Sequence, residues 1–285
     1  MVGRVIKNYN GYYYVDVGPA GLWECRRRGK VKTKILVGDM LMITPIDTSK
    51  GVIEQVLARK NELRRPAVAN VDQIMVVMTP AVPKLNYRLT DTLLASCMYQ
   101  HLTPILLLNK CELNPHMTQW YTKYYRQCGY EVYAVSAYTG AGIGAVTARL
   151  DGKMTVFSGP SGVGKSSLLA RITGREDLHI GAVSKKIQRG RHTTRHAEII
   201  PLREQTYVVD TPGFSAVALA SAAPEEIQNL FPEFVPYLGR CRFSPCAHMA
   251  EPDCRIKEAV KDGHIFRARY ESYCQLFQAA KERKK

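Results

Sequence analysis

The order of three short motifs constrains the fold of this chain more strongly than any other feature. Residues 109–112 (Asn-Lys-Cys-Glu) come first, residues 159–166 (Gly-Pro-Ser-Gly-Val-Gly-Lys-Ser) come second, and residues 210–213 (Asp-Thr-Pro-Gly) come last. The second motif follows an apolar stretch at 153–157 and precedes a helical pattern at 165–172. A glycine-rich loop between a strand and a helix is typical of nucleotide-binding α/β domains, because its backbone N–H groups surround phosphate oxygens.

The position of the Asn-Lys motif indicates that this domain is circularly permuted. In an ordinary small GTPase the phosphate loop opens the domain, and the motif that recognises guanine lies far downstream. Here residues 109–112 precede residues 159–166, as if the later half of the fold had moved to the front. Permutation relocates the chain ends, and so decides which segments are attached to the nucleotide-sensing loops. We therefore expect a GTP-operated switch that moves its flanking segments.

The second and third motifs carry the predicted chemistry. Lys165 would contact the β- and γ-phosphate oxygens, and Ser166 would supply a hydroxyl to Mg²⁺. Asp210 would hold the same Mg²⁺, and the Gly213 N–H would sense the γ-phosphate. The sequence thus predicts a site that binds GTP or GDP together with Mg²⁺.

A basic segment at 190–195 (Gly-Arg-His-Thr-Thr-Arg) lies between these motifs. A GTPase needs a threonine here to close on Mg²⁺ and the γ-phosphate, and Thr193 or Thr194 can serve; an exposed basic loop is the alternative interpretation. Phe214 stands where a water-orienting Gln commonly follows, and an apolar ring cannot position water. Hydrolysis should therefore be slow without a partner, and His192 is the nearest candidate for the missing group. The predicted catalytic residues are Lys165, Ser166, Thr193, Thr194, Asp210, Gly213 and His192.

Glu112 departs from the usual guanine-recognition motif, which ends in Asp. The Asp carboxylate accepts hydrogen bonds from N1–H and from the exocyclic amine of guanine, and Glu112 carries the same charge one methylene further out. An imperfect pairing of this kind costs about 1–3 kcal/mol. Ser136 and Ala137 follow a predicted strand and fit the loop whose Ala137 N–H would meet guanine O6. The predicted nucleotide-binding residues are Asn109, Lys110, Cys111, Glu112, Ser136, Ala137, Gly159, Pro160, Ser161, Gly162, Val163, Gly164, Lys165, Ser166 and Ser167.

Residues 1–66 are predicted to form a small RNA-binding barrel. Apolar runs at 11–17, 34–36, 40–44 and 51–57 are separated by turn signals, which fits a five-stranded OB-fold better than an SH3-like barrel. Of the net charge of +15, residues 1–65 supply 13 Lys and Arg against 6 Asp and Glu. A basic end suggests a polyanionic partner, although the same charges would also suit a soluble surface. The predicted RNA-binding residues, in a loop between strands, are Arg26, Arg27, Arg28, Lys30 and Lys32.

A cluster of Cys and His near the C-terminus has the spacing of a metal site. Cys241, Cys246, His248 and Cys254 bring 3 of the 8 cysteines within 14 residues. Three thiolates and one imidazole complete a tetrahedral structural Zn²⁺ site with no open position for catalysis. The sequence therefore predicts one structural zinc ion per chain. The other cysteines are interpreted as packing residues: Cys25, Cys97, Cys111, Cys128 and Cys274.

Residues 67–222 alternate between apolar strands and helical patterns, which implies a parallel sheet covered by helices. The expected strands are 71–78, 104–108, 131–135 and 153–157, the expected helices are 87–100, 115–128 and 165–172, and 197–201 with 206–210 form a hairpin. Residues 223–285 are then a helical zinc domain with helices from Pro224, at 255–261 and at 265–284. The expected fold class is α/β: a circularly permuted P-loop GTPase fold, flanked by an N-terminal β-barrel (OB-fold) and a C-terminal α-helical zinc-binding domain.

Neither a targeting segment nor a membrane span is predicted. No apolar run approaches the roughly 20 residues of a membrane span, the longest useful one being 105–108, and the first residues lack the apolar stretch of a signal peptide. Cysteines without a secretory signal favour a reducing compartment. We expect a cytoplasmic monomer that does not engage a membrane.

Taken together, these motifs resemble the bacterial ribosome small subunit-dependent GTPase A family. The resemblance covers residues 2–273 and rests on the permuted motif order, the zinc spacing with Glu251-Pro252, and the segments 28–30 (Arg-Gly-Lys), 64–66 (Arg-Arg-Pro), 69–72 (Ala-Asn-Val-Asp) and 190–194. Glu112 is the departure, since the family usually has Asp there. The resemblance implies binding to the rRNA and proteins of the small ribosomal subunit, GTP hydrolysis stimulated by that subunit, and a late role in subunit maturation.

Two other classes of protein share part of this pattern. The phosphate loop also resembles that of guanylate kinase, but a kinase would need neither Asn109-Lys110 nor a zinc cluster. Adding GMP to ATP should yield ADP only with the kinase. The second alternative is a non-enzymatic RNA-binding assembly factor that only binds guanine nucleotide, which Phe214 favours and the intact phosphate loop opposes.

Overall fold

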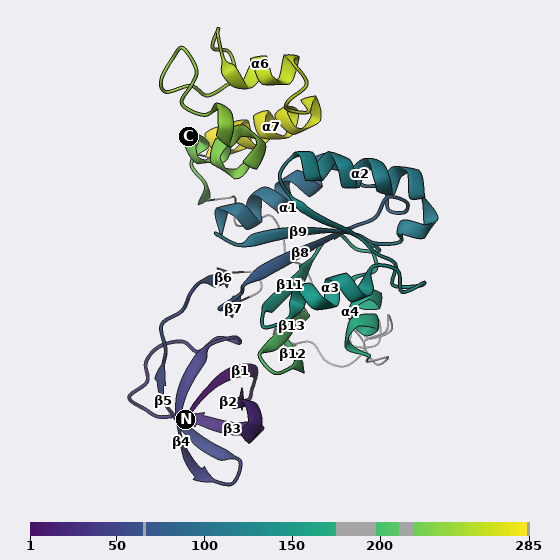
Figure 1. Cartoon of the computed structure of the whole chain (residues 1–285). Coiled ribbons are helices and arrows are strands. Elements are labelled where there is room, and N and C mark those ends of the chain that lie inside the picture. The colour runs from purple at the N-terminus through teal and green to yellow at the C-terminus, as the bar shows by residue number, and fades with distance from the viewer. Residues whose placement is uncertain (65–66, 175–197, 211–218, 220, 284–285) are drawn as a thin grey trace. The chain divides into compact units, whose positions relative to one another are not determined.

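The structure is a computed structural model that describes residues 1–64, 67–174, 198–210, 219 and 221–283 (Figure 1). The predicted site residues His192, Thr193, Thr194 and Gly213 lie outside the described residues, as does Phe214. Contacts divide the chain into two compact units. The first unit comprises Met1–Met75, Gly142–Ser158 and Gly164–Phe214, and the second comprises Val76–Ala141, Gly159–Val163 and Ser215–Lys285.

The N-terminal part of the first unit is a closed barrel. Its described strands are β1 (Val2–Tyr9), β2 (Tyr12–Asp16), β3 (Leu22–Arg27), β4 (Met40–Asp47) and β5 (Lys50–Val56), and they follow one another in the order β1-β2-β3-β5-β4. Alternate side chains enter the barrel, so that Val5, Val15, Cys25 and Ile53 are completely buried. The predicted OB-like barrel is therefore confirmed.

One predicted strand of the barrel is wrong. Residues 34–36 form no strand, because the chain turns there around the fully buried carboxylate of Asp39. Asp39 accepts hydrogen bonds from the Leu36 N–H (2.7 Å) and from Arg59 Nε (2.7 Å). These bonds compensate the buried charge of Asp39. The apolar run Ile35–Leu36–Val37 that precedes Asp39 does not predict this burial.

The basic run also lies differently from its predicted place between strands. Arg26 and Arg27 are the last two residues of β3, and only Arg28, Lys30 and Lys32 follow that strand. The guanidinium of Arg26 lies over the ring of Tyr12 on β2, 4.5 Å from the ring centroid. Neither β1 nor β3 is predicted from the sequence. The pairing of β1 with β2 is interrupted by an irregularity between residues 5 and 7, which blurs the period of two.

The barrel is attached by side chains to a second strand pair of the same unit, β12 (Glu198–Arg203) and β13 (Thr206–Asp210). The phenol of Tyr207 on β13 donates a hydrogen bond to the Asp16 carboxylate at 2.9 Å, and the guanidinium of Arg4 lies 5.0 Å from the centre of the same ring. Burial, together with the Asp16 carboxylate, raises the pKa of Tyr207 to about 12. The phenol therefore keeps the proton that it donates.

The α/β part contains a sheet with the strand order β10-β9-β8-β11-β13-β12. Strand β9 (Thr103–Leu108) is parallel to β10 (Glu131–Ala134), and β11 (Met154–Ser158) is parallel to β13, whereas β12 and β13 form the predicted antiparallel hairpin. Every residue of β8 (Gln73–Met78) and β11 is buried, as expected for strands of a parallel sheet. A short hairpin of β6 (Glu62–Arg64) and β7 (Ala67–Ala69) precedes β8.

Asparagine caps fix the start of two helices in the second unit. The Asn86 side chain accepts a hydrogen bond from the Leu89 N–H at the start of α1 (Tyr87–Tyr99), and Asn114 accepts one from the Met117 N–H at the start of α2 (Pro115–Gln127). Helix α4 (Lys165–Thr173) begins at the phosphate loop as predicted. Helix α3 (Ile143–Leu150) is not predicted, since its two buried residues give too short an apolar pattern.

The C-terminal part of the second unit contains two 3₁₀ segments, η6 (Pro224–Leu230) and η7 (Pro232–Tyr237), followed by α6 (Arg255–Lys261) and α7 (Arg267–Arg283). Ile227, Phe231, Phe234 and Tyr273 form its buried core, and Ala95 of α1 belongs to the same cluster. The predicted helical character is confirmed. Among the described helices, none is both long and apolar enough to cross a lipid bilayer.

A buried ion cluster joins α7 to α1 within this unit. The side chain of Arg269 on α7 is 1% exposed, and its Nη1 donates to Asp91 Oδ1 on α1 at 2.7 Å. Arg269 also pairs with Glu233 of η7, and its Nη2 donates to the Tyr130 hydroxyl at 3.0 Å. Burial alone would lower the pKa of Arg269, but its contacts with Tyr130, Asp91 and Glu233 hold that pKa well above its usual value.

Candidate functional site

The phosphate loop, residues 159–166, has the backbone geometry that its glycines predict. It leaves β11 at Ser158 and enters α4 at Lys165. Gly159 has φ +139°, and a Cβ at this position would lie 2.1 Å from the Val77 carbonyl oxygen. Gly164 is the left-handed N-cap of α4, with φ 88°. Only glycine can occupy position 159, and its lack of a side chain lets the loop run close to β8. The loop leads to the start of α4, where the first N–H groups of a helix have no partner within the helix.

The Asn-Lys motif lies directly after β9 and contacts the phosphate loop. Asn109 is 1% exposed, and its Nδ2 donates to the Val163 carbonyl oxygen at 2.8 Å. Asn109 Oδ1 accepts a hydrogen bond from the Ala137 N–H at 3.1 Å. One amide therefore joins three segments that are far apart in sequence. The Ala137 N–H, predicted to meet guanine O6, is bound to Asn109 here.

Lys110 makes a second link between the same segments. It has a left-handed backbone with φ 61°, and its ammonium donates to the carbonyl oxygens of Val82 and Gly162, at 2.8 Å each. Both acceptors are main-chain atoms, so the link depends on the loop conformation and not on neighbouring side chains. The structure thus brings Asn109, Lys110 and Ala137 together with the first part of the phosphate loop.

Glu112 carries an observation that points to a ligand. It lies in the short 3₁₀ turn Cys111–Leu113, and its Oε2 is buried without a hydrogen-bond partner among the described residues. A buried carboxylate oxygen without a hydrogen-bond partner costs free energy. An unpaired oxygen of this kind in a native protein is therefore a candidate position for a donor group of a bound ligand. Cys111 precedes it, half-buried, and burial raises the pKa of its thiol.

Asp210 is the last residue of β13. Because β13 runs parallel to β11, with Val209 opposite Val156, the two strands end at the same edge of the sheet. The backbone of Asp210 therefore emerges beside the strand that leads into the phosphate loop. This placement is the one that a shared Mg²⁺ would need, although the side chain of Asp210 lies outside the described part of the structure.

The four predicted metal ligands converge in the second unit. The ligand atoms of Cys241, Cys246, His248 and Cys254 all lie within 4.8 Å of one another. His248 Nδ1 is 3.5 Å from Cys241 Sγ and 3.3 Å from Cys254 Sγ, and the two sulfurs are 3.9 Å apart. Ligands about 2.0–2.3 Å from one tetrahedral zinc ion would lie about 3.5–3.8 Å from each other. The cluster could therefore hold a metal ion of this kind.

The loop that carries these ligands is held from several sides. The Glu251 carboxylate accepts hydrogen bonds from the Ala247 and Met249 N–H groups, at 2.8 Å each. Tyr270 on α7 donates to the His248 carbonyl oxygen at 2.6 Å. Burial lowers the pKa of His248, which favours the neutral imidazole that binds metals. The ligand positions are therefore fixed by the fold.

Gln228 of η6 is a functional candidate that the sequence does not predict. Its Oε1 lies 2.8 Å from His248 Nε2, the ring nitrogen that faces away from the cysteines. When Nε2 carries the proton, Gln228 Oε1 accepts a hydrogen bond from Nε2–H, and Nδ1 keeps its lone pair for the metal. The two residues are 20 positions apart, and no spacing rule connects a glutamine in a helical segment to a downstream Cys/His cluster.

The predicted RNA-binding residues of the barrel are all exposed. Arg28 and Lys30 pair with Glu54, at 2.9 and 3.1 Å, and these contacts, the Lys30 hydrogen bond first, lower the pKa of Glu54. Arg27 and Lys32 lie at the end of β3 and just beyond it. All five side chains are therefore accessible to a ligand, and two of them share the Glu54 carboxylate.

Comparison with known proteins adds to this geometry. The model of the RsgA GTPase family matches residues 56–220, and that of the RsgA N-terminal domain matches residues 2–53. The small ribosomal subunit biogenesis GTPase RsgA of Agathobacter rectalis is 41% identical, with all of both chains covered. The protein of the same name from Carboxydothermus hydrogenoformans is 44% identical, covering 96% of this chain and 95% of its own.

Two solved structures are similar over nearly the whole chain. YjeQ from Thermotoga maritima has a TM-score of 0.86 and 35% identity, covering 98% of each chain. YloQ, described as a circularly permuted GTPase, has a TM-score of 0.83 and 31% identity, covering 100% of this chain and 96% of its own. These likenesses favour GTP hydrolysis over the kinase and the non-enzymatic alternatives. The permuted motif order, the closed barrel and these matches show that the chain belongs to the RsgA family of circularly permuted GTPases.

Proposed function

We propose that this GTPase acts in the maturation of the small ribosomal subunit, binds that subunit through its rRNA and proteins, and hydrolyses GTP when bound. The main support is the match over the full chain to relatives named small ribosomal subunit biogenesis GTPase. The exposed basic residues Arg26, Arg27, Arg28, Lys30 and Lys32 supply the charge that RNA binding requires.

Stimulated hydrolysis is the direct test. GTP turnover would be measured for the full chain alone, with purified small subunits, and with purified large subunits at equal concentration. We expect slow turnover alone and a clear increase with small subunits only. Equal rates under all three conditions would refute the proposal.

For the nucleotide site, we propose that guanine lies against Asn109, Lys110, Glu112 and the Ser136-Ala137 loop. The buried, unpaired Oε2 of Glu112 supports this assignment, because guanine offers two N–H donors there. Replacing Glu112 with the shorter Asp should tighten GDP binding if the longer arm strains the contact. Weaker or unchanged binding would mean that the site has adjusted to Glu112.

At the phosphates, Lys165 and the N–H groups of the loop would bind the β- and γ-phosphate oxygens. Ser166 and Asp210 would hold Mg²⁺, which supplies positive charge to the phosphates when bound. Thr193 or Thr194 and the Gly213 N–H would close on the γ-phosphate, and His192 is the candidate that orients water. Comparing turnover of His192→Ala and His192→Gln with subunits present tests that last assignment.

The metal that best fits the C-terminal cluster is one structural Zn²⁺, held by Cys241, Cys246, His248 and Cys254. Three thiolates favour zinc over Mg²⁺ or Ca²⁺, and no ligand position would stay open for catalysis. Metal analysis of protein purified without chelators should give one zinc per chain. We also propose that the protein works as a monomer in the bacterial cytoplasm, where thiols stay reduced.

The nucleotide state would be passed from the Asp210–Gly213 motif to the zinc region through the chain that follows it. Only a short stretch separates Gly213 from η6, whose Gln228 contacts His248. Hydrogen exchange in the GTP and GDP states should therefore differ mainly between residues 213 and 240. Changes confined to residues 1–65 would refute this route.

A further inference from the structure

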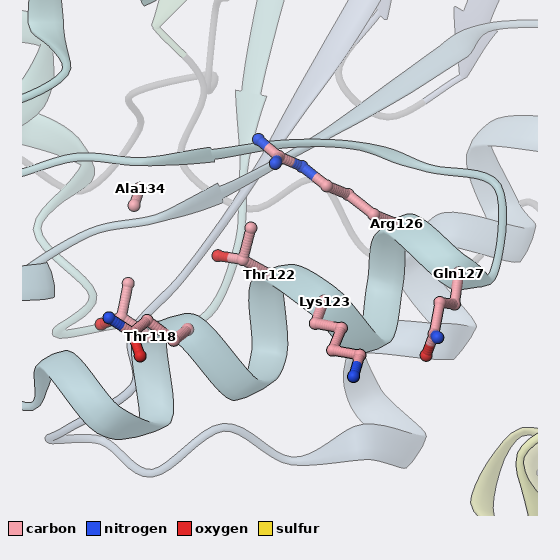
Figure 2. Close-up of a pocket in the computed structure, with 7 residues that line it drawn as sticks. Thr118, Thr122, Lys123, Arg126, Gln127 and Ala134 are labelled. Atoms are coloured by element: carbon pink, nitrogen blue, oxygen red, sulfur yellow. The ribbon is translucent and has the colours of Figure 1, made fainter.

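Outside the nucleotide and metal sites, helix α2 carries a groove of about 620 Å³ next to β10 (Figure 2). Its lining side chains are polar except for Ala134, but they expose mostly their aliphatic parts to the groove. Two rows of side chains one helical turn apart line it: Thr118, Thr122 and Arg126, and beside them Gln119, Lys123 and Gln127. All six side chains can donate hydrogen bonds. Thr118 already donates to the Asn114 carbonyl oxygen at 2.8 Å, and of the six only Lys123 and Arg126 are restricted to donating.

The charged side chains of α2 itself have one sign, and the next acid along the chain is Glu131 at the start of β10. Residues 113–130 contain His116, Lys123 and Arg126 but neither Asp nor Glu. Among the described residues no carboxylate lies within ion-pair distance of Lys123 or Arg126. Most surface helices mix charges of both signs. A helix face with cations and hydroxyl or amide donors, and without acids, is complementary to an anionic chain.

An exposed aromatic residue lies beside the same face. Trp120 follows Gln119 and is 49% exposed, with its indole Nε1 held by the Tyr87 hydroxyl at 3.2 Å. An exposed, fixed indole offers a surface on which a base can stack. Cations with an adjacent aromatic ring are a common combination in proteins that bind nucleic acid.

The contact made by Arg126 argues against a peptide as the occupant. β10 is the outermost strand of the sheet, and an added peptide strand would need its main-chain groups. Arg126 Nη2 already donates to the Val132 carbonyl oxygen of β10 at 2.9 Å. Figure 2 shows Arg126 extending toward the strand side, with Lys123 and Gln127 on the opposite flank of the helix. One main-chain acceptor of the strand edge is therefore occupied, and the exposed Lys123 and Gln119 remain available to a ligand.

We propose that this α2 groove is a second RNA-binding surface, which contacts the sugar–phosphate backbone of rRNA in addition to the barrel. The proposal rests on the proposed function, since it assumes that the protein binds RNA. It extends that function by placing an RNA contact on the helix that directly follows the guanine-recognition motif.

The test uses the full chain and measures affinity for a labelled RNA duplex as a function of salt. Gln119→Glu with Lys123→Glu should weaken binding about tenfold at low salt and reduce the slope of log affinity against log salt by about 1. The matched control is Gln278→Glu with Lys281→Glu, the same exchange at exposed positions of α7. Thermal unfolding of both variants establishes that they fold.

Each result of this test has a definite meaning. A larger loss for the α2 variant than for the α7 variant supports the groove. Equal losses of RNA affinity in the two variants overturn the proposal, because total charge would then explain the effect. No loss of RNA affinity in the α2 variant overturns it as well. Loss of binding to polyglutamate without loss of RNA binding would assign the groove to an acidic protein and overturn the RNA proposal. If the unaltered chain binds neither RNA nor small subunits, the proposed function fails as well.

Discussion

Replacing Arg269 with Met should be among the most destabilising single changes in the second unit. Its guanidinium is 1% exposed and lies between Asp91, which is 0% exposed, and Glu233, which is 5% exposed. Methionine keeps much of the volume but leaves two buried carboxylates without a cation. Breaking a buried ion pair from one side costs about 3–5 kcal/mol, which is a large share of the roughly 5–15 kcal/mol that stabilises a typical domain.

The matched control is Arg267→Met, two residues before Arg269 on the same helix. The Arg267 side chain is 86% exposed and pairs with Glu271 at 2.9 Å. An exposed pair of this kind contributes about 0.3–0.5 kcal/mol, so the control should change stability little. Urea unfolding would be followed by the fluorescence of Trp120 in a Trp23→Phe background, since Trp23 and Trp120 are the 2 tryptophans of the chain.

The comparison between the two variants decides whether the buried cation matters. A loss of unfolding free energy in Arg269→Met no larger than the loss in Arg267→Met would refute the reasoning.

Three further predictions concern the proposed sites. Lys165→Ala should abolish GTP turnover with little change in thermal unfolding, and normal turnover would rule out the phosphate-loop assignment. Glu112→Gln should weaken GDP binding about tenfold to a hundredfold in calorimetry, because an amide donor would face guanine donors; unchanged affinity would move guanine elsewhere. Gln228→Ala should weaken zinc binding about tenfold to a hundredfold in competition with a chelator, whereas Gln275→Ala, exposed on α7, should not.

Motif order and apolar periodicity were sufficient to predict the permuted α/β fold and the existence of the barrel. In the buried strand β8, residues 74–78 are an uninterrupted apolar sequence, and helices such as α2 begin at an Asn-Pro cap that is visible in the sequence. The same reasoning failed at residues 34–36. There a long-range ion pair between Asp39 and Arg59 decides the backbone conformation, and an apolar run cannot reveal it.

The site residues also divide into those that local sequence predicts and those that depend on tertiary contacts. The metal ligands are close in sequence, so their spacing predicted their convergence, whereas Gln228 depends on tertiary packing. The contacts that Asn109 and Lys110 make with the phosphate loop depend on main-chain carbonyl groups, which no residue pattern encodes. From the sequence, Arg269 resembles an exposed residue of a charged helix. Its burial cannot be predicted, because its hydrogen-bond partners come from three distant segments.

The bond between Tyr207 and Asp16 has a practical consequence for experiments that shorten the chain. Tyr207 lies three residues before Asp210, and its phenol and ring are covered by Asp16 and Arg4 of the barrel. A chain that lacks residues 1–66 would expose this tyrosine and loosen the strand that carries Asp210. Slow hydrolysis by such a chain would then have two causes, lost RNA contacts and a displaced Asp210. Tyr207→Phe in the full chain separates them, because it removes only the bond to Asp16.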